Sequence, residues 1–175
     1  MKYAAIFMAV LVAVGLMLGV YTYANAHLTA AAVSMNAAQG FEKPEDFAAL
    51  QNAMDHNALL GTAYADSLPG SSLDYVFETY TFRLRNGGLI GAEMVEIEPI
   101  PLEGDVLSYT TLDTAQVNAN LTVPARQERD AWCVVVHSAN QDELLRRQRK
   151  FRVTYYMWGM AKTMTVSYHY IYRRK

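Results

Sequence analysis

The sequence predicts an α+β protein, in which an N-terminal transmembrane or extended helix precedes a small body with one or two helices and a mainly antiparallel β-sheet. Residues 3–41 of the 175 contain no Asp, Glu, Lys or Arg, whereas residues 42–175 carry 31 of the 32 charged side chains, an ordinary density for a soluble domain. Apolar residues recur at helical spacing up to Leu84, and a two-residue period dominates after Gly91. Helices and strands are therefore separated along the chain, which is typical of the α+β class.

Residues 3–21 form an apolar run long enough to cross a bilayer. At a rise of about 1.5 Å per residue the run measures about 29 Å, close to the roughly 30 Å hydrocarbon core. Tyr21 and Tyr23 lie where an interfacial aromatic belt belongs. Lys2 is the one charge nearby, and by the positive-inside rule it places the N-terminus in the cytoplasm. We therefore expect a single-pass membrane protein, held through residues 3–23, with an extracytoplasmic body.

A cleavable signal peptide is the alternative interpretation of this segment. Ala24-Asn25-Ala26 fits the small-residue cleavage pattern, and cleavage there would release a secreted body beginning at His27. The apolar run exceeds the usual h-region of about 7–15 residues, which favours a retained anchor. Both interpretations export the body.

Small residues continue beyond the apolar run. Leu28, Ala31, Ala32 and Met35 recur at three- and four-residue steps, which predicts one helix over residues 4–39 that spans the membrane and then emerges. The chain is thereby divided into residues 1–40, the helix with its extension, and residues 41–175, the extracytoplasmic domain. Small side chains let helices approach closely, so this stripe is a candidate assembly interface.

Several elements are predicted within the body. The segment from Lys43 to about Leu60 starts with proline and acidic residues, which favours a helix. Apolar residues between Leu73 and Leu84 at helical spacing predict a second helix, and the aromatic and β-branched content of the same residues makes a strand the alternative. Strands are predicted at residues 95–98, 106–109, 116–123 and 132–137, and a hairpin at residues 151–158 and 163–172. Residues 141–150 are interpreted as a short helix or a long loop.

Charge is distributed unevenly along the body. Residues 42–113 carry thirteen acidic and three basic side chains, and residues 114–175 carry four acidic and eleven basic ones. The two halves either fold together with interleaved charges or form opposite faces that dock subunits. In the docking interpretation Arg146, Arg147 and Arg149 join the candidate assembly interface. A nucleic-acid partner is not expected, because the basic half accompanies an equally strong acidic half.

No combination of residues predicts a chemical reaction. The single cysteine, Cys133, cannot form an internal disulfide, and the histidines and cysteine have no metal-ligand spacing. Asp55 and His56 are adjacent and would diverge on a helix, while Cys133 and His137 would lie about 13 Å apart on a strand. His169 reads as a surface residue. We therefore expect no catalytic residue, no metal, no cofactor and no enzymatic activity.

The order of parts resembles the TadE-like pseudopilins of tight-adherence pilus systems. The features that carry it are Lys2, the spanning segment, the alanine-rich stretch from Tyr23 to Ala32 and the small β-rich body. Members of that family assist the assembly of an extracellular fibre, so the resemblance implies a structural component of a pilus or secretion apparatus, with other subunits or copies of itself as partners. The present sequence departs from the family in two features, the long basic leader and the Glu-bearing apolar helix. The resemblance therefore assigns no functional residue to this chain. The alternatives are a secreted or anchored binding module and an exported hydrolase.

Overall fold

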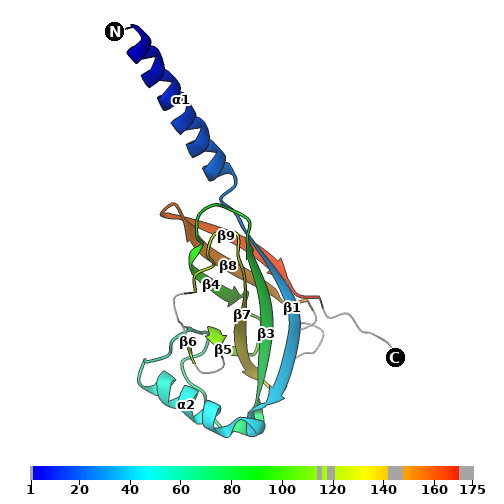
Figure 1. Cartoon of the computed structure of the whole chain (residues 1–175). Coiled ribbons are helices and arrows are strands. Elements are labelled where there is room, and N and C mark those ends of the chain that lie inside the picture. Colours follow the sequence, from blue (N-terminus) through cyan, green and yellow to red (C-terminus); the bar gives the residue numbers. More distant parts are fainter. Residues whose placement is uncertain (1, 114–115, 118–120, 142–147, 170–175) are drawn as a thin grey trace, which may run out of the picture.

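The computed structural model describes residues 2–113, 116–117, 121–141 and 148–169. Figure 1 shows the helix α1 projecting from one end of a body built of strands, with the helix α2 at the opposite end. The elements in chain order are α1 Lys2–Ala24, β1 Leu28–Gln39, α2 Pro44–Asp55, β2 Thr62–Ala63, β3 Tyr75–Asn86, β4 Glu93–Pro99, β5 Asp105–Asp113, β6 Gln116–Val117, β7 Glu128–Ser138, β8 Lys150–Met157 and β9 Met160–Ser167. Two short 3-10 turns, η1 (Gly40–Glu42) and η2 (Ser72–Asp74), precede α2 and β3.

The strands form two antiparallel sheets that pack face to face. The larger sheet has the order β1-β3-β7-β5-β2, with β6 paired to β5, and the smaller sheet has the order β4-β8-β9. Every pairing between these strands is antiparallel. The α+β architecture, with an apolar N-terminal helix, one further helix and mainly antiparallel sheets, is thus confirmed.

The helix predicted over residues 4–39 is wrong beyond residue 24. The Asn25 side chain donates to the Tyr21 carbonyl at 2.9 Å at the end of α1, and a strand begins three residues later. β1 pairs with β3 along its whole length, from Leu28 opposite Asn86 to Gln39 opposite Val76. Alanine favours a helix by itself, but this long ladder overrides both that preference and the local spacing. Residues 28–39 therefore belong to the folded body, and the boundary expected at residue 40 is displaced toward the N-terminus.

The helix predicted between Leu73 and Leu84 is wrong as well, and the strand alternative is right. β3 lies between β1 and β7, and both of its faces are covered over much of its length. Tyr80, Phe82 and Leu84 face the smaller sheet, while Tyr75 and Phe77 face α2. Apolar residues on both faces of one strand mimic a helical stripe, because they no longer follow a strict two-residue period.

Two apolar cores lie on opposite faces of the larger sheet. The first fills the space between the two sheets and takes residues from β1, β3 and β7 of the larger sheet and from all three strands of the smaller sheet. The second lies under α2 and contains Phe47 and Met54 from that helix with Phe77, Leu107 and Val136 from the sheet. The larger sheet therefore forms the central layer, with the smaller sheet on one side and α2 on the other.

The remaining expectations are largely met. The first helix of the body, the strands at 95–98, 106–109 and 132–137, and the hairpin correspond to α2, β4, β5, β7 and β8–β9. Of the strand expected at 116–123, Gln116–Val117 form β6 and Val123 makes an isolated bridge with Ala92, while residues 118–120 lie outside the described residues. Most of the 141–150 segment, and the end of the hairpin from residue 170, lie outside them too.

Candidate functional site

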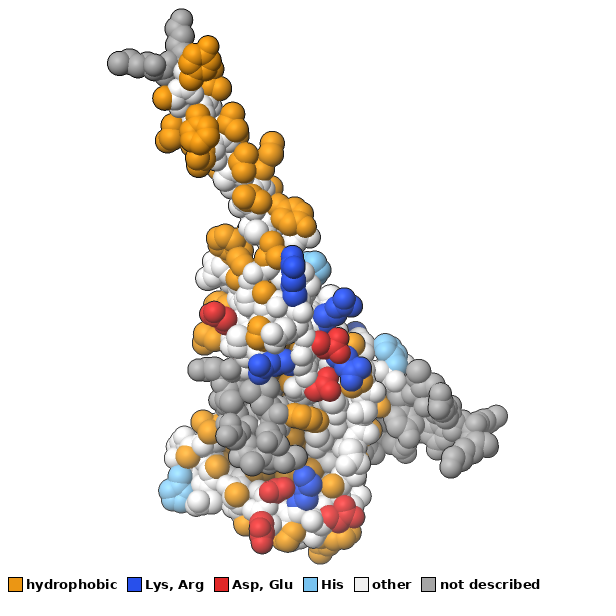
Figure 2. Space-filling view, in the orientation of Figure 1, with side chains coloured by type: hydrophobic (Ala, Val, Ile, Leu, Met, Phe, Trp, Pro, Cys, Tyr) orange, Lys and Arg blue, Asp and Glu red, His pale blue; other side chains and the backbone are white. Residues whose placement is uncertain are grey.

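The helix α1 is long and apolar enough to span a membrane. Residues Tyr3–Ala24 have a mean hydropathy of 2.5, and the most apolar part of this helix is not buried against the body. Figure 2 shows hydrophobic side chains along the visible face of this helix, while charged side chains gather on the body. Lys162 of β9 contacts the end of α1, because its ammonium group donates to the Ala26 carbonyl and lies 5.6 Å from the centre of the Tyr23 ring.

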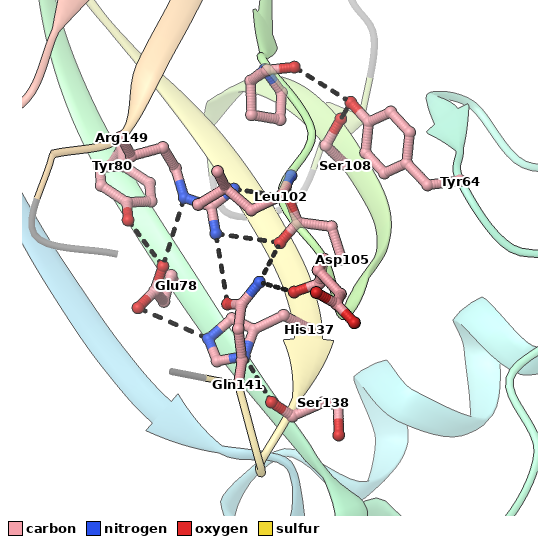
Figure 3. A network of polar contacts seen from close by, with 12 residues as sticks. Tyr64, Glu78, Tyr80, Leu102, Asp105, Ser108, His137, Ser138, Gln141 and Arg149 are labelled. Carbon is pink, nitrogen blue, oxygen red and sulfur yellow. Dashed lines mark hydrogen bonds and ion pairs between the residues drawn. The ribbon is translucent and has the colours of Figure 1, made fainter. Parts of the chain in front are cut away.

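A cluster of ionisable side chains (Figure 3) is buried on the inner face of the larger sheet, near the start of β3 and the end of β7. Arg149, just before β8, forms a bidentate pair with Asp105 of β5, at 2.7 Å and 2.9 Å. Its Nε atom also lies 3.7 Å from a carboxylate oxygen of Glu78 on β3. Arg149 and Glu78 are fully buried, and Asp105 is 7% exposed.

Neutral groups complete the cluster. The Tyr80 hydroxyl donates to Glu78 at 2.6 Å. Gln141 donates to Asp105 at 3.1 Å and to the Glu103 carbonyl at 2.7 Å. These hydrogen bonds replace the water that the two carboxylates lose on burial.

His137 of β7 adds a further titratable group to the cluster. Its Nδ1 atom is 2.8 Å from the Ser138 carbonyl oxygen, which can only accept, so Nδ1 is the protonated nitrogen. The Nε2 atom faces Glu78 at 3.5 Å.

The surroundings of Glu78 and Arg149 favour the charged forms of these two side chains. Burial by itself raises the pKa of Glu78, but hydrogen bonds from His137 and Tyr80 and the charges of His137 and Arg149 outweigh it and hold that pKa below its usual value. Burial lowers the pKa of Arg149, and the hydrogen bonds and charge of Asp105 more than reverse this effect. The cluster is closed to solvent, so we assign it to stability rather than to chemistry.

An open pocket of about 410 Å³ lies between α2 and the outer face of the larger sheet. Its floor is formed by Thr79, Thr81 and Trp132, and the half-buried Tyr109 also lines it. Burial raises the pKa of Tyr109 to about 12, which keeps its hydroxyl neutral. Hydroxyl groups and aromatic faces suit the binding of a polar ligand with an apolar face.

The predicted assembly residues do not form one surface. Leu28 is 3% exposed and packs in the core between the sheets. Ala32 and Met35 pack against that core from the edge strand, and Ala31 points outward and is exposed. Arg149, expected on a charged docking face, is instead buried in the ionic cluster, which corrects that prediction. Arg146 and Arg147 lie outside the described residues.

The acidic and basic halves of the chain interleave within one fold. Asp105 and Glu78 from the acidic half contact Arg149 from the basic half. Arg83 pairs with Glu128 and Asp130 in the opposite sense, at 3.2 Å to each. The interleaved interpretation of the uneven charge therefore holds for these pairs.

The residue pairs that the sequence analysis discounted stay separate. Cys133 and His137 share the inner face of β7, but the Cys133 thiol donates to the Ile97 carbonyl at 3.4 Å and His137 turns toward Glu78. Burial raises the pKa of Cys133, so the group remains a thiol. His56 bonds the Asn52 carbonyl of its own helix. Among the described residues, no group of three or more His, Cys, Asp or Glu is placed to hold a metal ion.

Sequence reasoning missed the ionic cluster and the pocket. Glu78 offered one signal, since it is a lone acid within the otherwise uncharged segment from Tyr75 to Phe82. A charge at such a position implies a buried partner.

Comparisons with known proteins add little. No family model matches the chain, and no curated protein matches it. Among solved structures, it is similar to an uncharacterized β-sandwich protein from Clostridium difficile, with 11% identity over 61% of this chain and 71% of that chain and a TM-score of 0.28. A similarity this distant carries no argument. The class of the protein therefore rests on its own structure, which is a body of two β-sheets joined to an exposed apolar helix.

Proposed function

We propose that the chain is a membrane-anchored, extracytoplasmic structural protein that assembles through the edge of β1. One observation carries the proposal. The charge-free segment of residues 3–41 supplies both an uncovered apolar helix and a twelve-residue edge strand directly after it. An anchor and a sheet edge that the described residues leave unpaired together suit a subunit that joins others at a membrane surface.

The anchor rests on α1. Twenty-two residues at about 1.5 Å each give about 33 Å, enough to cross the hydrocarbon core. With Lys2 on the cytoplasmic side, the body lies outside the cytoplasm. An alkaline phosphatase fusion after the body should be active, and an active cytoplasmic reporter at the same position would overturn this topology.

Packing at the base of α1 favours the anchor over a cleaved signal peptide. Ala26 is 2% exposed within the core between the sheets, and its carbonyl accepts a hydrogen bond from Lys162. Cleavage after Ala26 would remove this residue from the body and leave Lys162 without that acceptor. Mass spectrometry of the native protein distinguishes the two, because an intact chain supports the anchor and a start at His27 supports secretion.

The edge of β1 supports the assembly role. Within the described residues β1 pairs with β3 alone, and it contains neither charge nor proline. Sheet edges are normally protected by charged side chains, proline or short length, because free backbone groups can pair with another chain. We assign this edge to a second copy of the chain, since two identical edges can pair about a two-fold axis.

The experiment adds charges to this edge. Ala31 and Val33 are both exposed on β1, and Val33 lies at its bulge. Ala31→Lys with Val33→Lys should abolish crosslinking between copies of the full chain in proteoliposomes. The control is Ala48→Lys with Leu60→Lys, which adds the same charge at exposed positions near α2. Equal crosslinking in both variants, or a monomeric wild type, would contradict assembly through β1.

The resemblance to tight-adherence pseudopilins gives a finer version, in which the assembly is a pilus or a secretion apparatus. The second half of the alanine-rich stretch that contributed to the resemblance, Leu28 to Ala32, lies in β1, so such a subunit would join its neighbours through strand edges as well as through α1. Fibres sheared from cells should then contain the chain. Its retention in the cell membrane after shearing, with none in the fibres, would speak against this version.

The pocket under α2 supports a second candidate, an anchored or secreted module that binds an envelope polymer. Trp132 lines this pocket and offers an aromatic face beside Thr79 and Thr81. Saturable changes in Trp132 emission on adding solubilised cell-wall glycan would support it, and an unchanged spectrum at all concentrations would not.

A further inference from the structure

We propose that the end of the body around the base of α1 inserts into the interfacial layer of the bilayer that α1 spans. This inference rests on the proposed membrane anchoring. It adds a second contact with lipid, made by two loops of the body: the β3–β4 loop with the start of β4, residues 87–94, and the β8–β9 turn, residues 156–160. We call these two segments the rim.

Both rim segments pack at the base of α1. A side chain at Gly88 of the first loop would lie 2.8 Å from the Asn25 carbonyl oxygen, so this loop closely approaches the linker after α1. Beside the second segment, the Tyr155 hydroxyl accepts a hydrogen bond from the Leu28 N–H at 3.4 Å. Lys162 from the same hairpin contacts Ala26. A bilayer that contains α1 therefore lies next to both segments (Figure 1).

Exposed apolar side chains are concentrated on the rim. Leu89, Met94, Tyr156, Trp158 and Met160 are between 38% and 59% exposed. The other large apolar side chains exposed on the described body are scattered over it: Val33, Phe41, Leu60, Leu73 and Ile100. Single exposed apolar residues are ordinary, but a cluster of this kind indicates a contact with a partner or a membrane.

The backbone of the rim is strained where it exposes two of these side chains. Trp158 and Gly159 form the two-residue turn between β8 and β9, with φ of 57° and 68°. Positive φ at both positions is the requirement of a type I′ turn, which Asn-Gly satisfies best and a bulky aromatic residue satisfies poorly. Met94 also has a positive φ, of 49°, at a bulge in β4. The stability of the fold does not favour Trp158 or Met94 at these positive-φ positions. We therefore attribute them to a contact that the body makes with the membrane.

The chemistry of the rim matches the interfacial layer of a membrane. Tryptophan and tyrosine prefer the headgroup level, where the ring meets acyl chains and the polar atom stays hydrated. Tyr21 and Tyr23 on the last turns of α1 mark that level on the helix. Lys162 supplies a cation at the same height for lipid phosphate.

Seating the rim in the interface would hold the body upright on the membrane. β1 leads away from the base of α1 toward the far end of the body (Figure 1). Copies seated in this way present their β1 edges at the same height, which suits the lateral pairing proposed above.

The test uses tryptophan emission from the full chain in nanodiscs of phosphatidylcholine and phosphatidylglycerol. The chain has two tryptophans, and Trp132→Phe leaves Trp158 as the only emitter. The emission of Trp158 should be blue-shifted relative to that of a tryptophan in water. Replacing part of the lipid with a lipid brominated near the headgroup end of its chains should quench this emission. The matched control carries Trp132→Phe, Trp158→Asn and Leu73→Trp, which moves the emitter to η2 at the opposite end of the body, where no quenching is expected.

A second comparison leaves Trp132 in place. The difference in quenching between the wild type and Trp158→Asn gives the quenching that is due to Trp158. Asn-Gly suits the turn, so a loss of quenching in this variant cannot be ascribed to a damaged hairpin. If the chain floats with lipid and Trp158 is quenched no more than the tryptophan that Leu73→Trp introduces in the control, the rim does not touch the membrane and only the anchor stands. If the chain does not float with lipid, the membrane anchoring itself fails, and this inference fails with it.

Discussion

Replacing Arg149 by methionine tests whether the buried ionic cluster stabilises the fold. Methionine retains most of the volume of the side chain and removes its charge. Asp105 would keep hydrogen bonds from the Leu102 N–H and from Gln141, at 2.7 Å and 3.1 Å, but would lose its bidentate partner. Glu78 would lose the nearby guanidinium group. The variant therefore leaves two buried carboxylates without the cation that lies between them.

The expected cost follows from burial. Arg149 and Glu78 are fully buried and Asp105 nearly so, so solvent screens none of the lost attraction. Removing one partner of a buried ion pair costs about 3–5 kcal/mol. For a body of this size, the same loss lowers the melting temperature by about 6–20 °C.

The assay is urea unfolding of the full chain in detergent micelles, followed by far-ultraviolet circular dichroism. Arg83→Met is the matched control, because Arg83 forms ion pairs with Glu128 and Asp130 in which all three side chains are about half exposed. We expect the control to unfold close to the wild type. Adding Asp105→Asn to Arg149→Met should restore part of the loss, because it removes one of the two buried carboxylate charges.

A single result would refute this reasoning. If Arg149→Met and Arg83→Met unfold at the same urea concentration, the buried cluster contributes no more than a surface pair.

Three further predictions concern acid stability, thiol reactivity and the anchor. The lowered pKa of Glu78 contributes stability that is fully present above pH 4.5, its ordinary pKa, and is lost as the pH falls through the lowered pKa. Glu78→Gln should therefore flatten the acid side of a curve of unfolding free energy against pH. An unchanged curve would contradict this. Cys133 should react with an aromatic disulfide reagent only as the chain unfolds in urea, and rapid labelling of the native protein would count against its burial. Val14→Arg places a charge within the span at a cost of about 2.5–3.5 kcal/mol, so the chain should leave the membrane fraction, and retention there would argue against spanning by α1.

Elements fixed by local composition could be predicted from the sequence. The apolar helix, the proline-started α2 and the final hairpin each depend on signals within about twenty residues, and all three are present. The strand β7 was equally accessible, because its run of valines at residues 134–136 is typical of a central strand.

Two strands were mistaken for helices for different physical reasons. In β1, the alanines favour a helix locally, and pairing with β3 along the whole strand overrides that preference. In β3, apolar side chains face two separate cores, and the resulting pattern imitates a helical stripe.

The ionic cluster could not be assembled from the sequence, because its members come from four distant segments. Arg149 stands in a basic run, where a solvated position is the ordinary interpretation, and its partner Asp105 is 44 residues away. Only the order of the strands brings Glu78, Asp105 and His137 together on the inner face of the larger sheet.

The direct junction between α1 and β1 determines how the body responds to a mechanical pull. Only three residues separate the anchor from the strand, so tension along α1 passes into β1 with little slack. The hydrogen bonds between β1 and β3 lie across the strands, so a pull along β1 loads the whole ladder in shear instead of opening it one bond at a time. A subunit held in a membrane and drawn outward by its neighbours would therefore resist the force with its longest strand pair.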